Sequence, residues 1–298
     1  MSLYRNCLLC PRSCGVDRLA GARGFCGETA ELRIASAVLH RGEEPPISGK
    51  GGSGAVFVSG CNLGCVFCQN YQISREGMGR AVSADEFAGI CLELQRLGAE
   101  NINIVTGSHA IPAIAAGLDA ARSKGLVIPA LWNSSAYESP GGLELLRDRT
   151  AMFLPDLKTL DNDTAAHFFN APGYPGAAVK AILKMLEMAV TRNSVIIRHL
   201  VLPGCLESTR TVLRWFADNA RGRALLSLMT QYTPVGGKGP GRFLNREEYE
   251  TVLGWLGEFG IEDGFCQEPV TGSDWLPDFN RFNPFSSALS VPVWHWQR

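Results

Sequence analysis

From about residue 55 onward the chain repeats one pattern, in which a short apolar run is followed by a polar turn and then by a stretch with helical periodicity. Nearly continuous apolar character is typical of strands buried on both faces of a parallel sheet. Six strand–helix units in a row predict an α/β fold, either a partial (β/α)6 TIM-type barrel, which we favour, or an open doubly wound sheet. The six expected strands are residues 55–60, 101–107, 126–135, 151–158, 194–204 and 224–234.

The helical stretches between these strands carry their own start and stop signals. In residues 83–98, Ser83 and Glu86 can form a capping box, and Gly98 follows the last apolar position. In a barrel and in an open sheet alike, ligands bind where the strands end at their carboxyl edge. The other expected helices are residues 110–124, 140–148, 175–192, 208–220 and 246–258.

The segments on either side of the repeats differ from them. Residues 1–54 contain four cysteines, a glycine-rich connector and too little apolar sequence for a core, so we expect a cysteine-rich metal-binding segment. Residues 55–260 would form the barrel. Residues 261–298, rich in aromatic residues and proline, would pack across its open side or present a partner-binding surface. The glycine-rich loop 234–242 is expected to be mobile and to cover the site.

Composition argues against several classes of function. Hydrophobic residues make up 46% of the chain and charged residues 19%, and no apolar run approaches the length of roughly 18 residues that a membrane span needs. A net charge of −1 without a Lys/Arg block argues against nucleic-acid binding. The N-terminus lacks the features of a secretory signal, so we expect a cytoplasmic protein without membrane partners. In that reducing compartment, ten cysteines indicate metal ligands or core residues.

Three of these cysteines stand directly after the first expected strand. In "SGCNLGCVFCQNY", residues 59–71, Cys61, Cys65 and Cys68 are spaced C-x3-C-x2-C, with the aromatic Phe67 before the last. A structural metal site usually closes its shell with four protein ligands, whereas three ligands leave a position open for chemistry. The alternative is one part of a zinc site that a distant residue completes.

This stretch resembles the motif of the radical S-adenosylmethionine (SAM) superfamily, C-x3-C-x-aromatic-C after the first strand of a partial (β/α)6 barrel. The resemblance implies a 4Fe-4S cluster on Cys61, Cys65 and Cys68, with the amino and carboxylate groups of SAM on the fourth iron. One electron would then cleave SAM to methionine and a 5′-deoxyadenosyl radical, and this radical would abstract hydrogen from a substrate. The cofactors would supply the difficult chemistry. A flavodoxin or ferredoxin is the implied electron donor.

More narrowly, the sequence is similar to activating enzymes of pyruvate formate-lyase and other glycyl radical enzymes, and to their homologues with a cysteine-rich leader. Asn70 follows the last cysteine as in that family. "PDLK" resembles its aspartate-x-lysine element, which implies that Lys158 pairs with the SAM carboxylate and that Asp156 helps to bind a monovalent cation or SAM. "WNSSAYES" and "RHLVLPG" resemble its third- and fifth-strand elements, and they imply further cofactor contacts at Asn133, Ser135, Arg198 and His199.

One element departs from that family. After the second strand the family carries Gly-Gly-Glu, which binds the SAM amino group, whereas this chain has "TGSHA". Gly107, Ser108 and His109 therefore stand at an expected cofactor contact without its glutamate. Three interpretations remain open: Ser108, His109 and backbone carbonyls replace the contact, His109 faces the substrate, or His109 caps the following helix.

A second group of cysteines lies near the N-terminus with the spacing C-x2-C-x3-C-x11-C. Four cysteines in so short a segment suffice for a complete all-thiolate site. The spacing does not distinguish zinc from a second iron–sulfur cluster, and free thiols in a loop are the alternative. The four residues are Cys7, Cys10, Cys14 and Cys26.

Three hypotheses for the function follow. The first is a radical SAM enzyme that abstracts hydrogen from a glycine in a partner protein, as the activating enzymes do. The second keeps this chemistry but gives it a peptide or a small molecule as substrate. The third is a non-catalytic metal-binding module that serves as an assembly or electron-transfer partner. Equilibrium binding of SAM separates the third hypothesis from the others.

Overall fold

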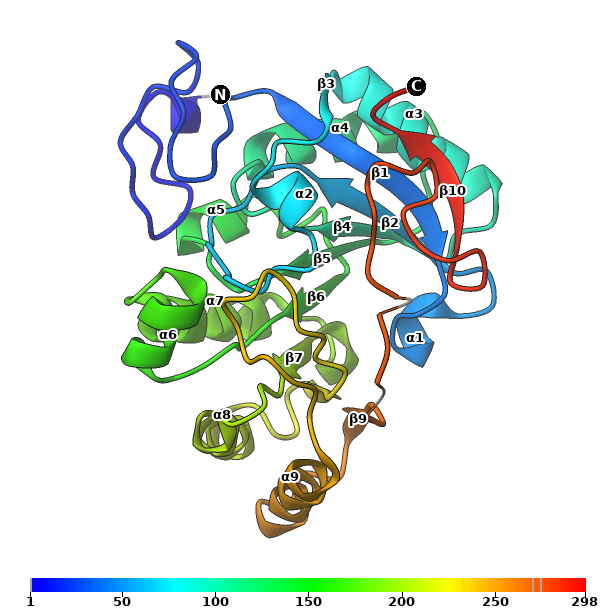
Figure 1. Ribbon diagram of the computed structural model, residues 1–298. Coiled ribbons are helices and arrows are strands. Elements are labelled where there is room, and N and C mark those ends of the chain that lie inside the picture. The colour runs from blue at the N-terminus through cyan, green and yellow to red at the C-terminus, as the bar shows by residue number, and fades with distance from the viewer. Residues whose placement is uncertain (1, 270, 274) are drawn as a thin grey trace.

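In a computed structural model, the chain is an α/β protein in which all six expected strands form. The structure describes residues 2–269, 271–273 and 275–298. The strands β2, β4, β5 and β6 pair in parallel in that order, and β7 pairs in parallel with β8 (Figure 1). Parallel bridges from Phe153 to Val195 and from Asp156 to Arg198 join β6 to β7, so the six strands form a partial barrel as predicted. Their bounds are β2 Ser53–Val58, β4 Ile102–Val105, β5 Ala130–Ser134, β6 Met152–Pro155, β7 Ile196–Leu200 and β8 Leu225–Met229.

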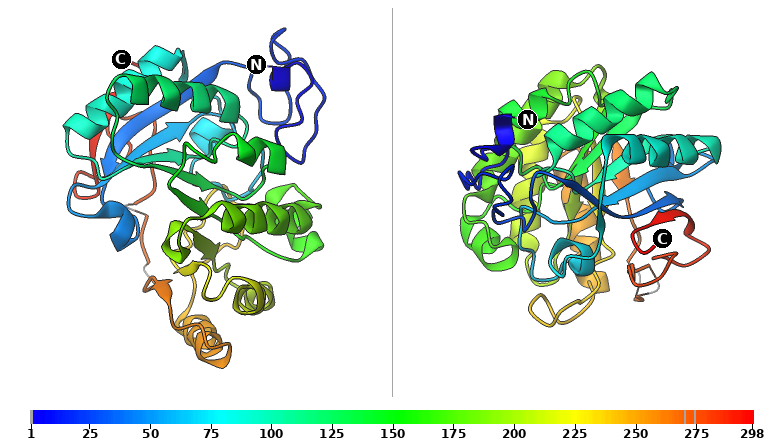
Figure 2. Two further views of the ribbon diagram at one scale, coloured as in Figure 1. Left: turned by 180° about the vertical axis from the view of Figure 1, so that it is seen from behind. Right: turned by 90° about the horizontal axis from the view of Figure 1, so that it is seen from above.

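Helices cover the outer face of the barrel. Figure 2 shows α3 and α4 on one side of the sheet and the C-terminal segment on the other. The predicted capping box of α3 is present, because the Glu86 N–H donates to Ser83 Oγ at 3.1 Å and the Ser83 N–H donates to Glu86 Oε2 at 2.9 Å. The expected helices form as α3 Ala84–Arg96, α4 Ile111–Ser123, α5 Pro140–Glu144, α7 Tyr174–Met188, α8 Leu206–Asn219 and α9 Arg246–Glu258.

Several further elements lie outside the repeated pattern. The strand β1, Leu32–His40, pairs antiparallel with β2 and with the C-terminal strand β10, Ser290–His295. The main sheet therefore includes part of the expected segment 1–54, and the cysteine-rich part ends before residue 32. The remaining short elements are η1 Ser2–Tyr4, α1 Pro45–Ser48, α2 Tyr71–Ser74, β3 Arg80–Val82, α6 Asn162–Phe169, η2 Arg192–Ser194 and β9 Gly264–Cys266.

Two segments outside the repeated pattern, α1 and residues 267–289, pack on the inside of the barrel. The helix α1 places Ile47 among Leu131, Leu154 and Ile196, at the amino ends of the strands. The segment 267–289 runs from β9 to β10, and its Phe279 packs against Phe57 of β2 with ring centroids 5.4 Å apart. The open side of the barrel therefore lies under the C-terminal segment, of which positions 270 and 274, like position 1, lie outside the described residues. Of the helices described, none is both long and apolar enough to cross a membrane.

Candidate active site

The loop after β2 carries Cys61, Cys65 and Cys68, and all three line one cavity of about 300 Å³ at the carboxyl edge of the strands. The chain enters this loop through Gly60, which has a φ of +82°. A Cβ at this position would lie 2.4 Å from Glu28 Cγ, so the turn requires glycine in both its conformation and its packing. The predicted placement of the three cysteines at a strand end is therefore present in the structure.

The aromatic residue of the motif fixes the loop against the barrel wall. Phe67 is buried, and its ring lies 5.8 Å from that of Phe169 and 5.4 Å from that of Tyr232, measured between centroids. The Gly64 N–H donates to the Phe169 carbonyl at 3.0 Å, and the Val66 N–H donates to the neighbouring carbonyl at 2.9 Å. The cysteine loop is thus tied to the end of α6, a helix that the sequence analysis did not predict.

Asp156 and Lys158 follow β6 and line the same cavity. Lys158 Nζ lies 2.7 Å from Asp156 Oδ2. Burial alone would lower the pKa of Lys158, but the Asp156 carboxylate beside it helps to raise this pKa above its ordinary value. Burial raises the pKa of Cys61 to about 11 and that of Cys65 to about 12, so at neutral pH a metal must displace the thiol protons.

Polar groups at the ends of β4 and β5 complete the wall. Asn133 and Ser135 line the cavity, and Ser135 Oγ is buried without a hydrogen-bond partner among the described residues. Thr106, which the sequence analysis missed, also lines it. Its φ of +65° is unusual for a residue with a side chain, and its N–H donates to the Asn133 carbonyl at 2.9 Å. Its place at a strand end was the only signal for it.

The next three residues, which were expected to contact the cofactor, turn away from the cavity. Gly107 is packed so tightly that a Cβ there would lie 2.7 Å from Trp132. Ser108 Oγ donates to Glu138 Oε1 at 2.6 Å. His109 lines a different cavity, and α4, which begins at Ile111, has no side-chain cap at its N-cap residue Ala110. The His109 side chain therefore neither lines the Cys61 cavity nor caps α4, while a SAM contact through the backbone carbonyls of "TGSHA" stays a prediction.

The two residues expected from β7 point to opposite faces of the strand. Arg198 lines the cavity, where its guanidinium pairs with Glu43 at 2.6 Å and also with Glu44. His199 points outward, and its ring nitrogens bond to the backbone after β6 at 2.7 Å and to Thr209 of α8 at 2.9 Å. Burial lowers the pKa of His199 to about 4, so the ring is neutral. The structure therefore brings only Arg198 to the site.

The end of β8, the residues that follow it and the C-terminal segment supply the far wall, for which the sequence analysis named no residue. Polar side chains from these parts face the cysteine loop across the cavity. The predicted residues on the cavity wall are Cys61, Cys65, Cys68, Asn70, Asn133, Ser135, Asp156, Lys158 and Arg198, and the additional polar ones are Gln69, Thr106, Ser134, Gln231, Tyr232, Thr233 and Gln267.

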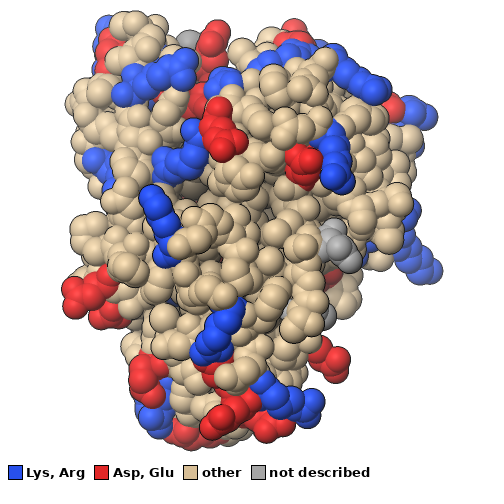
Figure 3. Space-filling model, in the orientation of Figure 1, with Lys and Arg blue, Asp and Glu red and all other residues tan. Residues whose placement is uncertain are grey.

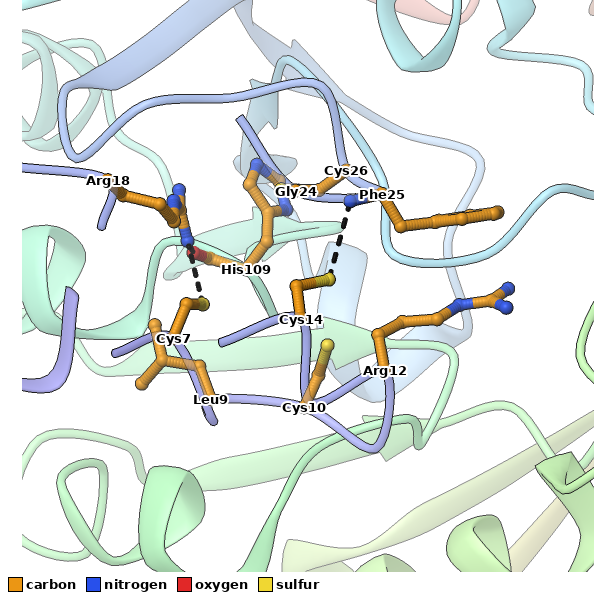
Figure 4. Close-up of a pocket in the computed structure, with 10 residues that line it drawn as sticks. All are labelled: Cys7, Leu9, Cys10, Arg12, Cys14, Arg18, Gly24, Phe25, Cys26 and His109. Carbon is orange, nitrogen blue, oxygen red and sulfur yellow. Dashed lines mark hydrogen bonds between the residues drawn. The ribbon is translucent and has the colours of Figure 1, made fainter. Parts of the chain in front are cut away.

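The four N-terminal cysteines line a second, smaller cavity together with His109 (Figure 4). Burial raises the pKa of Cys10 to about 11, and it raises the pKa of Cys26 as well. Within the described ranges, no three Cys, His, Asp or Glu side chains have the geometry to hold a single metal ion, and this applies to both groups of cysteines.

Charged side chains of both signs are interspersed on the face shown in Figure 3. The centre of this face is largely free of charge, in the region where Figure 1 shows the loop after β8 and the C-terminal segment. A continuous basic stripe, which a nucleic-acid backbone would require, is not visible on this face.

Comparison with known proteins gives one family and several solved relatives. The family model described as "Radical SAM superfamily" matches residues 55–216. An uncharacterised protein from Methanocaldococcus jannaschii is 29% identical over 240 residues, which cover 78% of this chain and 68% of that protein.

The solved structures share the fold at low identity. A radical SAM methyltransferase from Sphaerobacter thermophilus matches with a TM-score of 0.56 and 18% identity, over 74% of this chain and 68% of that one. SuiB from Streptococcus suis, bound to SAM, matches with a TM-score of 0.54 and 16% identity, over 70% of this chain and 48% of SuiB. The chain thus spans about half the length of SuiB. A domain of a pyruvate-formate lyase-activating enzyme from Bacteroides vulgatus gives a TM-score of 0.42, too low to bear on this chain.

Proposed function

Because the chain belongs to the radical SAM superfamily, we propose that it is an enzyme that cleaves SAM reductively and abstracts hydrogen from a glycine in a partner protein. The observation that carries this proposal is the convergence of Cys61, Cys65, Cys68, Asp156 and Lys158 on one cavity at the carboxyl edge of the barrel. Fold likeness alone does not define an activity, so the argument rests on these side chains.

The residues of the cavity fit both a 4Fe-4S cluster and SAM. Iron–sulfur clusters are held by cysteine thiolates, and three thiols converge here. The ammonium of Lys158 suits the SAM carboxylate, and the Asn133 amide suits a polar group of the same ligand. The buried Ser135 hydroxyl has no partner in the described structure, and a buried polar group of that kind costs free energy until a ligand satisfies it.

When bound, the cluster supplies one electron for the cleavage of SAM. The protein holds the positive charge of Lys158 in place through Asp156 and keeps water from the reacting centre. Exclusion of water depends on the apolar part of the wall, which consists of Leu63, Phe67, Val105, Leu200, Met229 and Trp275.

The size of the cavity favours a macromolecular substrate over a small molecule. A volume of about 300 Å³ is at the low end for a ligand of the size of SAM. SAM would therefore fill the enclosed space, and the substrate would approach from the mouth, as a glycine on an extended segment of a partner protein can. A free peptide is the closest alternative, because it can approach in the same way.

An electron donor must reach the loop that carries Cys61, Cys65 and Cys68 from a side that SAM does not occupy. On its other side lies a hollow of about 590 Å³, where Cys65 and Cys68 lie with Arg75 and Lys238. Cys65 and Cys68 thus line both the cavity and this hollow. We propose that a flavodoxin or ferredoxin docks at this hollow.

Release of 5′-deoxyadenosine tests the proposed activity. Anaerobically reconstituted protein that receives dithionite and SAM should release it, and Cys65→Ala should abolish the release because the cluster loses a ligand. Cys266→Ala is the control, since Cys266 is an exposed cysteine outside the cavity wall. If protein with a full cluster never releases 5′-deoxyadenosine, the proposal is wrong. Deuterium transfer to this product from a labelled glycine in a partner protein, rather than from a peptide or small molecule, identifies the substrate.

A further inference from the structure

The N-terminal loop 5–31 contains neither helix nor strand. Its apolar cluster is small and consists of Tyr4, Cys7 and Leu9, with Val16 and Ala30 against them. So little apolar burial does not offset the conformational entropy of ordering a loop of this length. Small segments of this kind are usually held by disulfides or by a metal, and the cysteines here are free thiols.

We propose that this loop and the barrel share a second metal centre, with thiolates from the loop and His109 from the barrel. The inference does not depend on the proposed function. Figure 4 shows Cys7, Cys10 and Cys14 around the same cavity as His109, with the Cys7 sulfur toward Arg18 and the Cys14 sulfur toward the Phe25 N–H. The chain also approaches closely at Gly24, where a Cβ would lie 3.0 Å from Cys14 Sγ.

The hydrogen bonds of His109 leave one ring nitrogen available as a ligand. His109 is 3% exposed, and its Nε2 lies 2.8 Å from the Ser59 carbonyl oxygen. A carbonyl only accepts hydrogen bonds, so Nε2 carries the proton and Nδ1 carries a lone pair. Nδ1 is buried without a partner in the described structure, in a residue that lines the cysteine cavity. A histidine bound to metal through one nitrogen usually donates its other N–H to a backbone carbonyl or carboxylate, as His109 does.

Arg18 provides a second, independent observation. Its side chain is 2% exposed, and its described hydrogen bonds go to the carbonyls of Glu28, Thr29 and His109 and to Cys7 Sγ, which lies 3.8 Å away. A buried guanidinium is costly unless anions lie beside it. None of these carbonyls carries a charge, and the nearby Glu28 carboxylate forms its ion pair with Arg33 instead, at 3.0 Å. A metal centre with several thiolate ligands has a net negative charge, which would compensate Arg18.

The wall of the second cavity also touches the loop that carries Cys61. Ser59 accepts the hydrogen bond from His109 and directly precedes the turn at Gly60. A Cβ at Gly60 would lie 3.0 Å from the carbonyl oxygen of Cys26, so the two cysteine loops are in direct backbone contact. Binding of metal at the N-terminus should therefore also hold the first residue of the Cys61 loop in position.

Thiolate and imidazole ligands suit either Zn²⁺ or an iron–sulfur cluster. In the described residues, neither group of cysteines can hold a single ion as it stands.

Metal analysis of a variant without Cys61, Cys65 and Cys68 tests the second centre. The triple alanine variant, purified anaerobically, should retain about four irons per chain for a cluster, or about one zinc in the alternative form of the same centre. Further replacement of Cys10 and Cys14 by Ala should remove this metal. If the triple variant holds no more metal than the quintuple variant, the inference is wrong. Should these variants fold poorly, the iron and zinc content of the wild type and of Cys10→Ala/Cys14→Ala makes the same comparison.

The role of His109 is tested by competition with a chelator. His109→Ala should weaken retention of the N-terminal metal by at least about tenfold, leave the other cluster loaded, and be rescued in part by His109→Cys. His199→Gln is the matched control, because that histidine is equally buried but lines neither cavity. Retention of both metals by His109→Ala as in the wild type would show that His109 is not a ligand.

Discussion

Lys158 places a positive charge at the wall of the cavity. Its pairing with Asp156, at 2.7 Å, lets it stay charged in a half-buried position. Replacement by Met should weaken SAM binding by at least about tenfold, or about 1.4 kcal/mol, because the SAM carboxylate loses its partner and Asp156 is left without a counter-charge. Isothermal titration of cluster-loaded protein with SAM measures the change.

Lys184→Met is the control for this measurement. The Lys184 side chain is 20% exposed, against 21% for Lys158, and it pairs with Glu144 and Glu187 away from the cavity. Its replacement should leave the SAM affinity unchanged. Equal affinities for wild type and Lys158→Met would contradict the assigned role of Lys158.

His199 makes stability depend on pH. Burial lowers its pKa to about 4 in the folded chain, whereas an unfolded histidine titrates at about 6.5. As the pH falls between these values, the unfolded state gains a proton that the folded state does not, so the folded state loses stability. The free energy of unfolding of His199→Gln should therefore improve relative to wild type between about pH 7 and about pH 5.

Urea unfolding at these two pH values measures this difference. His167→Gln, which changes an exposed histidine of α6, is the control variant. A constant offset from the wild type for His199→Gln would show that its ring does not resist protonation.

Some side chains of the site could be predicted from the sequence because their motif fixes them to a strand end. Cys61 and Lys158 belong to this class. The segment "TGSHA" does not, because its side-chain directions depend on one backbone angle, the φ of +65° at Thr106. That turn points Thr106 into the cavity and His109 toward the N-terminal cysteines, and no residue pattern specifies it.

Among the elements, the segment 267–289 has the clearest stabilising contact. Phe279 is fully buried, its ring packs on Phe57, and its N–H donates to Gln72 Oε1 at 2.7 Å. Phe279→Ala should lower the free energy of unfolding by about 3–5 kcal/mol, because it leaves a cavity under the segment. Denaturant unfolding measures the loss, and Leu253→Ala on the exposed side of α9 should change stability far less. Equal losses in the two variants would mean that the segment is not anchored by Phe279.

The strands and helices that were predicted are those with a strong local signal. Apolar runs predicted the six barrel strands, and the capping box of Ser83 and Glu86 predicted where α3 begins. The strand β1 is also apolar, but it pairs antiparallel and lies outside the repeated units, so periodicity did not identify it. The short β9 exists because β8 offers it an edge, which is a tertiary effect.

At the scale of the whole molecule, the fold brings the loop that carries Cys61 against the N-terminal loop 5–31. The order of strand–helix units predicted the barrel and placed Cys61, Cys65 and Cys68 at its carboxyl edge. The contact between Cys26 and Gly60 could not be predicted, because it depends on how a loop without secondary structure folds back on the barrel. The far wall of the cavity was missed for a similar reason, since it comes from residues after β8 and from the C-terminal segment.

We infer that three thiols of the cavity hold a cluster to which SAM binds. Electron paramagnetic resonance of the anaerobically reduced protein, recorded before and after addition of SAM, tests it most directly. We predict a cluster signal that changes when SAM is added, in the wild type and in Cys10→Ala/Cys14→Ala, and that is lost in Cys65→Ala. The absence of any signal that responds to SAM, or a SAM-responsive signal that persists without Cys65 but disappears without Cys10 and Cys14, would contradict this assignment.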